Sequence, residues 1–149
     1  MPCTIEPLKH PDLEALALLW RRSREGAQPW LELRMGYTPA EDLSFLRNVV
    51  AQECDMWVAR EGPTLLGFLA LAGEKIEQLY VDPLAQGTGV GTALLDRARQ
   101  LSPTRLTLFT HLGNSGARAF YERRDFHAVA FGTSPPPESE PDVTYVREP

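Results

Sequence analysis

The chain has 149 residues, with 15 Lys and Arg against 20 Asp and Glu, so its formal net charge is −5. A chain of this length is expected to form one domain, here 1–149, which buries roughly two-thirds of the surface of the unfolded chain. The acidic balance argues against a nucleic-acid partner, because phosphate backbones are bound by basic surfaces, and it slightly favours a cationic substrate.

Cysteines and apolar runs narrow the setting further. The two cysteines, Cys3 and Cys54, are too few for a disulfide framework and lack metal-ligand spacing, so we expect reduced thiols, no metal and a cytoplasmic location. The first residues lack the basic and apolar regions of a signal peptide. The longest apolar run, 65–72, is far shorter than the ~20 residues that cross a bilayer, so no membrane partner is expected.

The first third of the chain predicts a strand followed by two helices. Pro11 and Asp12 open the first helix, and Gly26 ends it. Thr38-Pro39-Ala40-Glu41 is a capping box with proline at the first helical position, and it begins the second helix. The expected ranges are 3–8 for the strand, 11–26 for the first helix and 38 to about 53 for the second.

Two segments are expected to be irregular. Residues 27–37 are rich in large side chains, which either line a pocket or fold onto the core. Residues 133–142 are rich in Pro, Ser and Glu, and Pro135-Pro136-Pro137 should be extended and solvated, as expected of a surface loop between two strands.

The remaining elements complete an α/β sandwich with a mixed sheet and helices on both faces. The strand at 65–71 is apolar throughout, as expected of a central strand covered on both sides. In the next helix Val90, Leu94, Ala98 and Leu101 form one apolar stripe. The other expected strands are 56–60, 76–81, 105–110, 127–132 and 143–146, and a short helix runs from Asn114 to about Arg124.

A glycine-rich loop at residues 86–92 stands between a strand and this helix. The first amides of a helix lack intrahelical partners and are partly positive, and glycines allow a ligand to approach the backbone, so the pattern predicts a phosphate site. The loop is not a Walker loop, because it lacks lysine. It is not a dinucleotide fingerprint either, because Thr92 stands where the third glycine belongs.

Two motifs together resemble one family. Gln86-x-x-Gly89-x-Gly91 resembles the acyl-coenzyme A pyrophosphate loop of the GNAT superfamily of N-acetyltransferases. Asn114-x-x-Ala117-x-x-Phe120-Tyr121-Glu122-x-x-x-Phe126 resembles its second signature, at the usual separation. The resemblance covers nearly the whole chain, although the first half matches only in its order of elements. It implies a sheet of about seven strands, whose two central strands splay apart to admit the pantetheine arm of acetyl-coenzyme A.

The resemblance also implies how the cofactor is held. Amides of the loop 86–92 would bind the pyrophosphate, and the strand 79–81 would pair with the pantetheine arm. The family often has Arg or Lys where Thr88 stands, so affinity should be somewhat weaker here. Asn114 would contact the arm, cap its helix, or do both. The expected cofactor-binding residues are Leu79, Tyr80, Val81, Gln86, Gly87, Thr88, Gly89, Val90, Gly91, Thr92, Asn114 and Tyr121.

The catalytic roles follow from the same resemblance. Tyr121 is the expected acid, because a phenol has a pKa of about 10 and a thiol about 8.5, so the phenol can donate to a forming thiolate. Glu77 is the preferred base over Glu74, since we expect Glu77, Leu79 and Val81 to share one strand face beside the thioester; it is otherwise a solvated carboxylate.

Three further expectations concern His111, Asp125 and the acceptor. His111, just after a strand, either flanks the acceptor or has a structural role. Asp125 replaces the glycine of the second signature and should adopt a positive φ. The acceptor site should be built from 27–37 and the 133–142 loop, and many relatives in the family are homodimers.

The expected function is transfer of an acetyl group from acetyl-coenzyme A to a primary amine of a small molecule by direct attack. One alternative is a non-catalytic acyl-coenzyme A sensor or partner module on the same fold. The other is a protein or peptide N-acetyltransferase, which would need an open groove.

Overall fold

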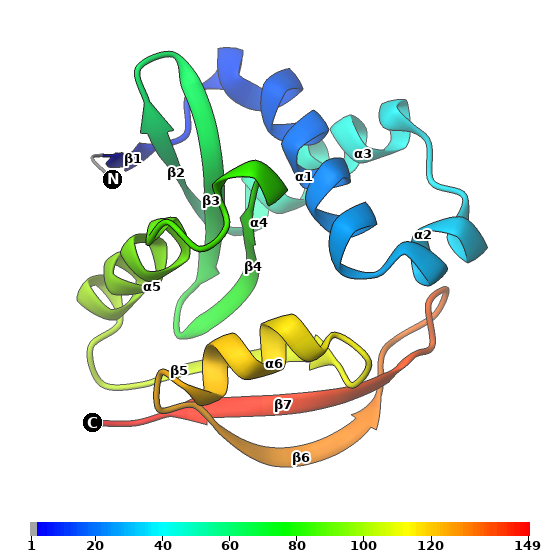
Figure 1. Ribbon diagram of the computed structural model, residues 1–149, viewed down its shortest axis with the longest axis vertical. Helices are drawn as coiled ribbons and strands as arrows, with labels where there is room; N and C mark the ends of the chain where they lie inside the picture. Colours follow the sequence, from blue (N-terminus) through cyan, green and yellow to red (C-terminus); the bar gives the residue numbers. More distant parts are fainter. Residues whose placement is uncertain (1–2) are drawn as a thin grey trace.

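A computed structural model describes residues 3–149 as one mixed seven-stranded sheet with the strand order β1-β2-β3-β4-β5-β7-β6 (Figure 1). All seven expected strands are present. Met1 and Pro2, where the expectation about a signal peptide begins, lie outside the described residues. The strands are β1 Thr4–Pro7, β2 Asp55–Glu61, β3 Thr64–Ala72, β4 Lys75–Val81, β5 Leu106–His111, β6 His127–Thr133 and β7 Pro141–Arg147.

The helices cover both faces of the sheet, as expected. They are α1 Leu13–Ala27, α2 Pro29–Met35, α3 Pro39–Phe45, α4 Ala51–Glu53, α5 Val90–Leu101 and α6 Ser115–Glu122. Short turns of other helical types are η1 His10–Asp12, η2 Leu46–Val50 and η3 Pro83–Ala85. Within residues 3–149, no helix is both long enough and apolar enough to cross a bilayer.

The central strand β3 separates two hydrophobic clusters. Leu69 and Leu71 pack into a cluster with α5, α6 and the strands β5 and β7, whereas Phe68 and Ala70 pack into a cluster with α1 and η2. Successive side chains of a strand point to opposite faces, so an uninterrupted apolar run fills both clusters. This confirms the prediction of a central strand covered on both sides.

The sheet is almost divided between β4 and β5. These two strands run parallel and pair at only two positions, Lys75 with Thr107 and Ile76 with Leu108. Figure 1 shows the consequence, with β2, β3 and β4 in the upper part of the molecule and β5, β7 and β6 crossing the lower part. This is the splaying of central strands that the family resemblance implied.

The structure corrects the prediction of an irregular segment at 27–37, because Pro29–Met35 form helix α2 and Ala27 is the last residue of α1. Pro29 takes the first turn, where its missing N–H does no harm, and Gly36 ends the helix with a φ of 64°. Leu101 also departs from its expected apolar stripe, because it is 46% exposed while Ala98 is fully buried.

Two local predictions are confirmed. At the start of α3 the Thr38 hydroxyl accepts the Glu41 amide at 3.2 Å, and the Glu41 carboxylate accepts the Thr38 amide at 2.8 Å. The helix then continues through the π-helical η2 to α4, close to the expected end at Glu53. Asp125 has a φ of 67° directly after α6, in the place of the usual glycine.

Candidate functional site

The glycine-rich loop leads from β4 into α5 with an open set of backbone donors. Gly87 and Gly89 have φ of 78° and 92°, which side-chain-bearing residues rarely adopt. Gly89 precedes the first residue of α5, and no side chain caps this helix start. The first-turn amides of Val90, Gly91 and Thr92 therefore have no intrahelical acceptor, as expected for an anion cradle.

Asp82 fixes the loop at its other end. Its carboxylate accepts the Leu84 amide at 3.0 Å and the Arg22 guanidinium at 2.6 Å, so it ties the turn after β4 to helix α1. The contacts with Arg22 and Leu84 lower the pKa of Asp82, although burial opposes them. The loop is thus held on its strand side and open on its helix side.

Arg124 lies beside this helix start, and the sequence analysis missed it. Its Nη2 donates to the Thr92 hydroxyl at 2.9 Å, and its guanidinium stacks 3.8 Å above the Phe120 ring. Within residues 3–149 no carboxylate lies within ion-pair distance of it, and burial together with Arg123 lowers its pKa. Thr88, where the family often has a cation, instead donates its hydroxyl to the Ala85 carbonyl. Arg124 therefore brings a positive charge to the loop from α6.

Two glycines allow close packing around the loop. A Cβ on Gly91 would lie 3.0 Å from the Phe120 ring, so glycine is needed where α6 rests against the start of α5. A Cβ on Gly67 in β3 would lie 2.7 Å from the Tyr80 carbonyl oxygen in β4. Both contacts fix elements that border the gap between β4 and β5.

A β-bulge at Glu77 corrects the predicted face of β4. Ala70 pairs with Gln78, but the next residue, Leu71, pairs with Ile76, so Glu77 is the extra residue. One extra residue reverses the alternation of side chains. Glu77 therefore does not share a face with Leu79 and Val81, which pack toward α5 and α6.

Glu77, Gln78 and Tyr80 instead line a cavity between β4 and the helices α1 to α3. Its carboxylate lies 3.1 Å from the Lys75 ammonium, and the two side chains are about equally exposed. The Tyr80 ring stacks on Phe68 with a centroid distance of 5.9 Å, and burial raises the pKa of Tyr80. Glu77 thus lines this cavity on the side of α1 and α3.

The cavity has a volume of about 660 Å³ and lies between β4, the end of β5 and the helices α1 to α3. Both segments expected to form the acceptor site contribute to its wall, with Gln28 to Tyr37 on one side and residues 134–138 on the other. Its lining residues are Trp20, Arg24, Gln28, Leu31, Glu32, Tyr37, Glu41, Asp42, Phe45, Glu77, Gln78, Tyr80, Phe109, Thr110, His111, Asn114, Ser134, Pro135, Pro136, Pro137, Glu138 and Asp142.

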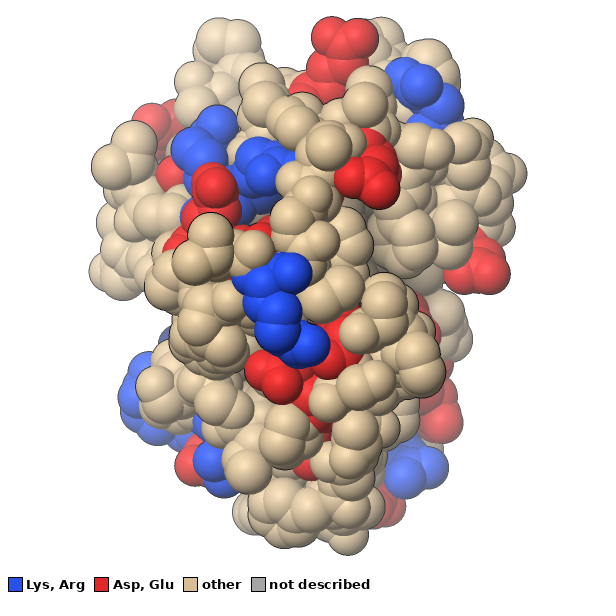
Figure 2. All heavy atoms as spheres, turned by 90° about the vertical axis from the view of Figure 1, so that its right-hand side faces the viewer, with Lys and Arg blue, Asp and Glu red and all other residues tan. Residues whose placement is uncertain are grey.

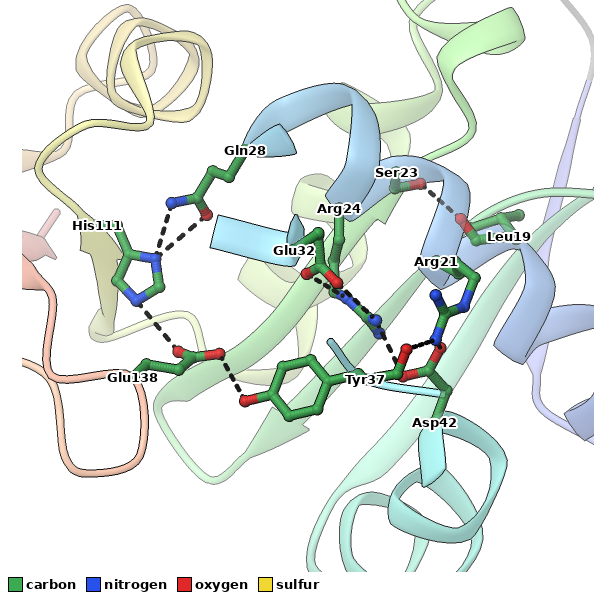
Figure 3. A network of polar contacts seen from close by, with 10 residues as sticks. All are labelled: Leu19, Arg21, Ser23, Arg24, Gln28, Glu32, Tyr37, Asp42, His111 and Glu138. Carbon is green, nitrogen blue, oxygen red and sulfur yellow. Dashed lines mark hydrogen bonds and ion pairs between the residues drawn. The ribbon is translucent and has the colours of Figure 1, made fainter. Parts of the chain in front are cut away.

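Buried ion pairs hold one wall of the cavity together (Figure 3). Arg24 donates to both oxygens of Glu32, at 2.8 and 3.1 Å, and to Asp42 at 2.9 Å. Asp42 also pairs with Arg21 at 2.8 Å, and the Arg24 guanidinium lies 4.1 Å above the Trp20 ring. The positive charge of Arg24 is therefore matched by carboxylates from α2 and α3.

A second polar chain crosses the cavity from α2 to β5 and the 134–140 segment (Figure 3). The Gln28 amide contacts His111 Nδ1 at 2.8 Å, and His111 Nε2 lies 3.4 Å from the Glu138 carboxylate. The Tyr37 hydroxyl donates to the other Glu138 oxygen at 3.2 Å. The contact with Glu138 raises the pKa of His111, and the same contact lowers the pKa of Glu138.

Asn114 caps the start of α6 and Tyr121 lies near its end, and Tyr121 is not among the residues that line the cavity. Tyr121 is 6% exposed and packs edge-on against Phe120 and Phe126, and burial raises its pKa. In the described part of the chain no group hydrogen-bonds its hydroxyl. The Asn114 side chain accepts the Ala117 amide at 3.2 Å, which confirms its role as the N-cap of α6. Asn114 also lines the cavity.

The cysteines and acidic residues do not form a metal centre in the part of the chain that is described. Among residues 3–149, no three His, Cys, Asp or Glu side chains are grouped as metal ligands. Cys3 and Cys54 are both free thiols.

Comparison with known proteins places the chain among acetyltransferases. The model of the Acetyltransferase (GNAT) family matches residues 13–126, which is more than half of the chain. The chain is 33% identical over 129 residues to the peptidyl-lysine N-acetyltransferase YjaB of Escherichia coli (strain K12), covering 85% of this chain and 83% of YjaB. It is 29% identical over 133 residues to the probable N-acetyltransferase Rv2775 of Mycobacterium tuberculosis, covering 82% and 76% of the two chains.

Solved structures agree on the fold. The solution structure of apo-form YjaB from Escherichia coli matches with a TM-score of 0.83 and 26% identity, over 98% of this chain and 97% of YjaB. The PaiA N-acetyltransferase of Thermoplasma acidophilum, solved in complex with coenzyme A, matches all of both chains with a TM-score of 0.73. At 21% identity this second match concerns the fold alone.

Proposed function

This chain belongs to the Acetyltransferase (GNAT) family, and from that premise we propose that it acetylates a primary amine of a small molecule. The family makes it an N-acetyltransferase that depends on acetyl-coenzyme A. The observation that carries the proposal is the cavity of about 660 Å³ beside the gap between β4 and β5, with polar groups facing into it. We further propose roles for single residues, a class of acceptor and a single domain that spans residues 1–149.

The loop and its surroundings fit acetyl-coenzyme A. The uncapped start of α5 and the positive φ of Gly87 and Gly89 suit a pyrophosphate, and so does Arg124, which has no carboxylate partner among residues 3–149. Backbone groups of 79–81 have no partner on β5, since pairing stops at Ile76, and we assign this stretch to the pantetheine arm. The Val81 carbonyl, however, already accepts the Ser23 hydroxyl at 3.1 Å and the Gln86 side-chain amide at 3.3 Å. The cofactor, when bound, supplies an activated acetyl thioester. We assign Gln86 to Thr92 to its phosphates and Asn114 to its arm.

Tyr121 and Glu77 are our candidates for the proton transfers. Tyr121 keeps its proton at neutral pH, because burial raises its pKa, and its hydroxyl has no acceptor among residues 3–149. We propose that it donates a hydrogen bond to the leaving thiolate and then gives up its proton, a transfer that the raised pKa opposes. The Glu77 carboxylate faces the cavity from the bulge of β4, where it can accept a proton from an incoming ammonium, directly or through water.

Residues 134–140, which we call the clasp, contact α2 and Tyr37, and these contacts favour a small acceptor. The Trp30 indole donates to Glu140 at 3.3 Å, and Arg34 donates to the Glu138 carbonyl at 2.7 Å. Tyr37 adds its contact with the Glu138 carboxylate. A clasp across the cavity leaves less room for a polypeptide than for a free amine.

Acetylation of a peptide lysine is the second candidate, because YjaB is named a peptidyl-lysine N-acetyltransferase. A non-catalytic acyl-coenzyme A sensor is less favoured, since the relatives named above are enzymes. We also propose a homodimer. Every residue of the edge strand β6 is exposed, none is Lys, Arg, Asp or Glu, and a second copy could pair along it. Light scattering of the purified protein tests this directly.

Calorimetry with acetyl-coenzyme A, followed by a thiol-release assay, tests the function. We expect micromolar binding and turnover on small amines that exceeds turnover on lysine peptides. Binding without turnover on any amine would favour the sensor, and absence of binding would refute the reading of the loop.

The Glu77→Gln variant tests the base. We expect kcat/KM to fall by about 10²-fold and the acidic limb of the pH–rate profile to change. A normal profile would remove Glu77 from the mechanism.

A further inference from the structure

Negative charge dominates the wall of the cavity. Six carboxylates line it, whereas within the described residues its only Arg or Lys is Arg24. That cation is already bound to Glu32 and Asp42, and Lys75 pairs with Glu77 at 3.1 Å, so among the described residues Glu41, Glu138 and Asp142 have no Arg or Lys within ion-pair distance. Figure 2 looks onto the side of the molecule that carries α2 and the clasp, and near the middle of this face acidic atoms gather around a basic side chain. The lining carboxylates are Glu32, Glu41, Asp42, Glu77, Glu138 and Asp142.

Aromatic rings form much of the remaining wall. The face of an aromatic ring attracts a cation, and the attraction grows when the cation leaves bulk water. A cavity that combines such faces with carboxylates favours positively charged ligands over neutral ones of the same shape. The aromatic lining residues are Trp20, Tyr37, Phe45, Tyr80 and Phe109.

Glu138 is oriented but not neutralised by a permanent cation. One oxygen accepts the Tyr37 hydroxyl at 3.2 Å and the other faces His111 at 3.4 Å. Tyr37 is uncharged, and Arg34 reaches only the backbone carbonyl of Glu138. About a third of the Glu138 side chain is exposed, at 30%, and it lines the cavity. The carboxylate is thus held in place with its charge available to a ligand.

Glu138 and Glu77 line the same cavity from different elements. Glu138 belongs to the 134–140 segment and lies 3.4 Å from His111 at the end of β5, whereas Glu77 is the bulge residue of β4. The amine that attacks a thioester must be unprotonated, so it contributes no lasting charge. A second cavity carboxylate such as Glu138 is therefore free to bind another charged group of the acceptor.

We propose that the cavity selects acceptors that carry a second positive charge, bound by Glu138 and the Tyr37 ring while the other amine reacts near Glu77. This rests on the proposed function, since it takes the cavity as the acceptor site. A linear diamine supplies both groups. A lysine beside a basic residue in a peptide offers the same chemistry, and the clasp favours the free diamine.

The experiment compares 1,5-diaminopentane with n-pentylamine, which has the same chain and one amine. We expect kcat/KM to be about 10- to 100-fold higher for the diamine, beyond the factor of about two for its two reactive ends, because a charge-assisted hydrogen bond is gained. Glu138→Gln should lower kcat/KM much more for the diamine than for pentylamine, so that the ratio approaches the statistical factor.

Glu140→Gln is the matched control. Glu140 belongs to the same clasp and contacts Trp30 and Arg34, but it does not line the cavity. It should keep the diamine preference, and thermal unfolding of both variants excludes loss of structure. A lysine peptide with a neighbouring arginine, compared with one with a neighbouring alanine, separates the peptide source from the diamine source.

Turnover of both amines at similar kcat/KM by the wild-type enzyme would overturn this inference and leave the acetyltransferase function intact. A preference that survives Glu138→Gln, or that Glu140→Gln abolishes equally, would overturn the assignment to Glu138. A preference confined to the arginine-flanked peptide would overturn the diamine. No turnover of any amine would refute the proposed function first, and the inference with it.

Discussion

Replacing Tyr121 by phenylalanine should separate catalysis from stability. The substitution removes one oxygen from a side chain that is 6% exposed and whose hydroxyl has no hydrogen-bond partner within residues 3–149. No hydrogen bond is lost, so the free energy of unfolding should change by less than ~0.5 kcal/mol. For a chain of this size that corresponds to a shift in Tm of no more than about 2 °C.

The catalytic effect should be large. A positioned acid contributes about 10²- to 10⁴-fold to a rate, which corresponds to ~3–5 kcal/mol of transition-state stabilisation. We expect Tyr121→Phe to lower kcat by about 10²- to 10⁴-fold and to change the affinity for acetyl-coenzyme A less than about threefold. Thiol release at saturating cofactor measures kcat, and calorimetry measures the affinity.

Tyr145→Phe provides the matched control. The Tyr145 hydroxyl accepts Arg118 Nε at 3.1 Å and donates to Glu122 at 2.5 Å, while its ring is fully buried. Its removal should cost about 1–2 kcal/mol of stability and leave kcat nearly unchanged. If Tyr121→Phe retained wild-type kcat, or lost stability as Tyr145→Phe does, the reasoning about the free hydroxyl would be wrong.

Three further predictions concern packing, the loop cation and pH. Gly67→Ala should destabilise the fold by ~1–3 kcal/mol in urea unfolding, because the added Cβ would lie 2.7 Å from the Tyr80 carbonyl oxygen. Gly116→Ala should not destabilise it, because the nearest atom to the added Cβ is 4.0 Å away. Arg124→Gln should weaken acetyl-coenzyme A binding about 10-fold by calorimetry, and unchanged affinity would restrict Arg124 to holding α6. The pKa of Glu138 is lowered from its ordinary value of 4.5, and that of His111 is raised from its ordinary value of 6.5. Between pH 4.5 and pH 6.5 the ion pair of these two residues should therefore stabilise the fold by ~0.2–1 kcal/mol. This contribution should disappear as the pH falls through the lowered pKa or rises through the raised one, and a difference in Tm between wild type and Glu138→Gln that is independent of pH would contradict it.

Features with a local cause could be predicted from the sequence. The capping box at Thr38, the N-cap at Asn114 and the positive φ of Asp125 each depend on a few neighbouring residues. The apolar run of β3 predicted its burial on both faces, because only a central strand hides both. The glycine loop belongs to the same class, since strand, turn and helix follow within one short segment.

Features that depend on strand register were missed. The bulge at Glu77 arises from how β4 pairs with β3, and no residue near Glu77 announces it. Because one inserted residue reverses the faces, a correct strand prediction still assigned Glu77 to the wrong side. Helix α2 was missed for a different reason, since its seven residues are too few to establish a helical period.

Contacts across long stretches of chain were also out of reach. Glu138 contacts Tyr37 and His111 only in the folded chain, because these residues lie far apart in the sequence. From the sequence we expected both segments that build the cavity, but not the contacts between them. From the sequence, Arg124 was named only as the approximate end of a short helix. Its unpaired charge beside Thr92 becomes visible only when α6 lies against α5.

The two residue pairs that join β4 to β5 also bear on cooperativity. Each half of the sheet is internally paired along whole strands, while the seam between the halves has only Lys75 with Thr107 and Ile76 with Leu108. Without a ligand, the β5-β7-β6 half should open in hydrogen exchange at a lower free energy than β2-β3-β4. A ligand bound to both edges of the seam would connect the two halves and stabilise the folded protein by RT ln(1 + [L]/Kd). Cofactor binding should therefore also set how cooperatively the two halves of the sheet unfold.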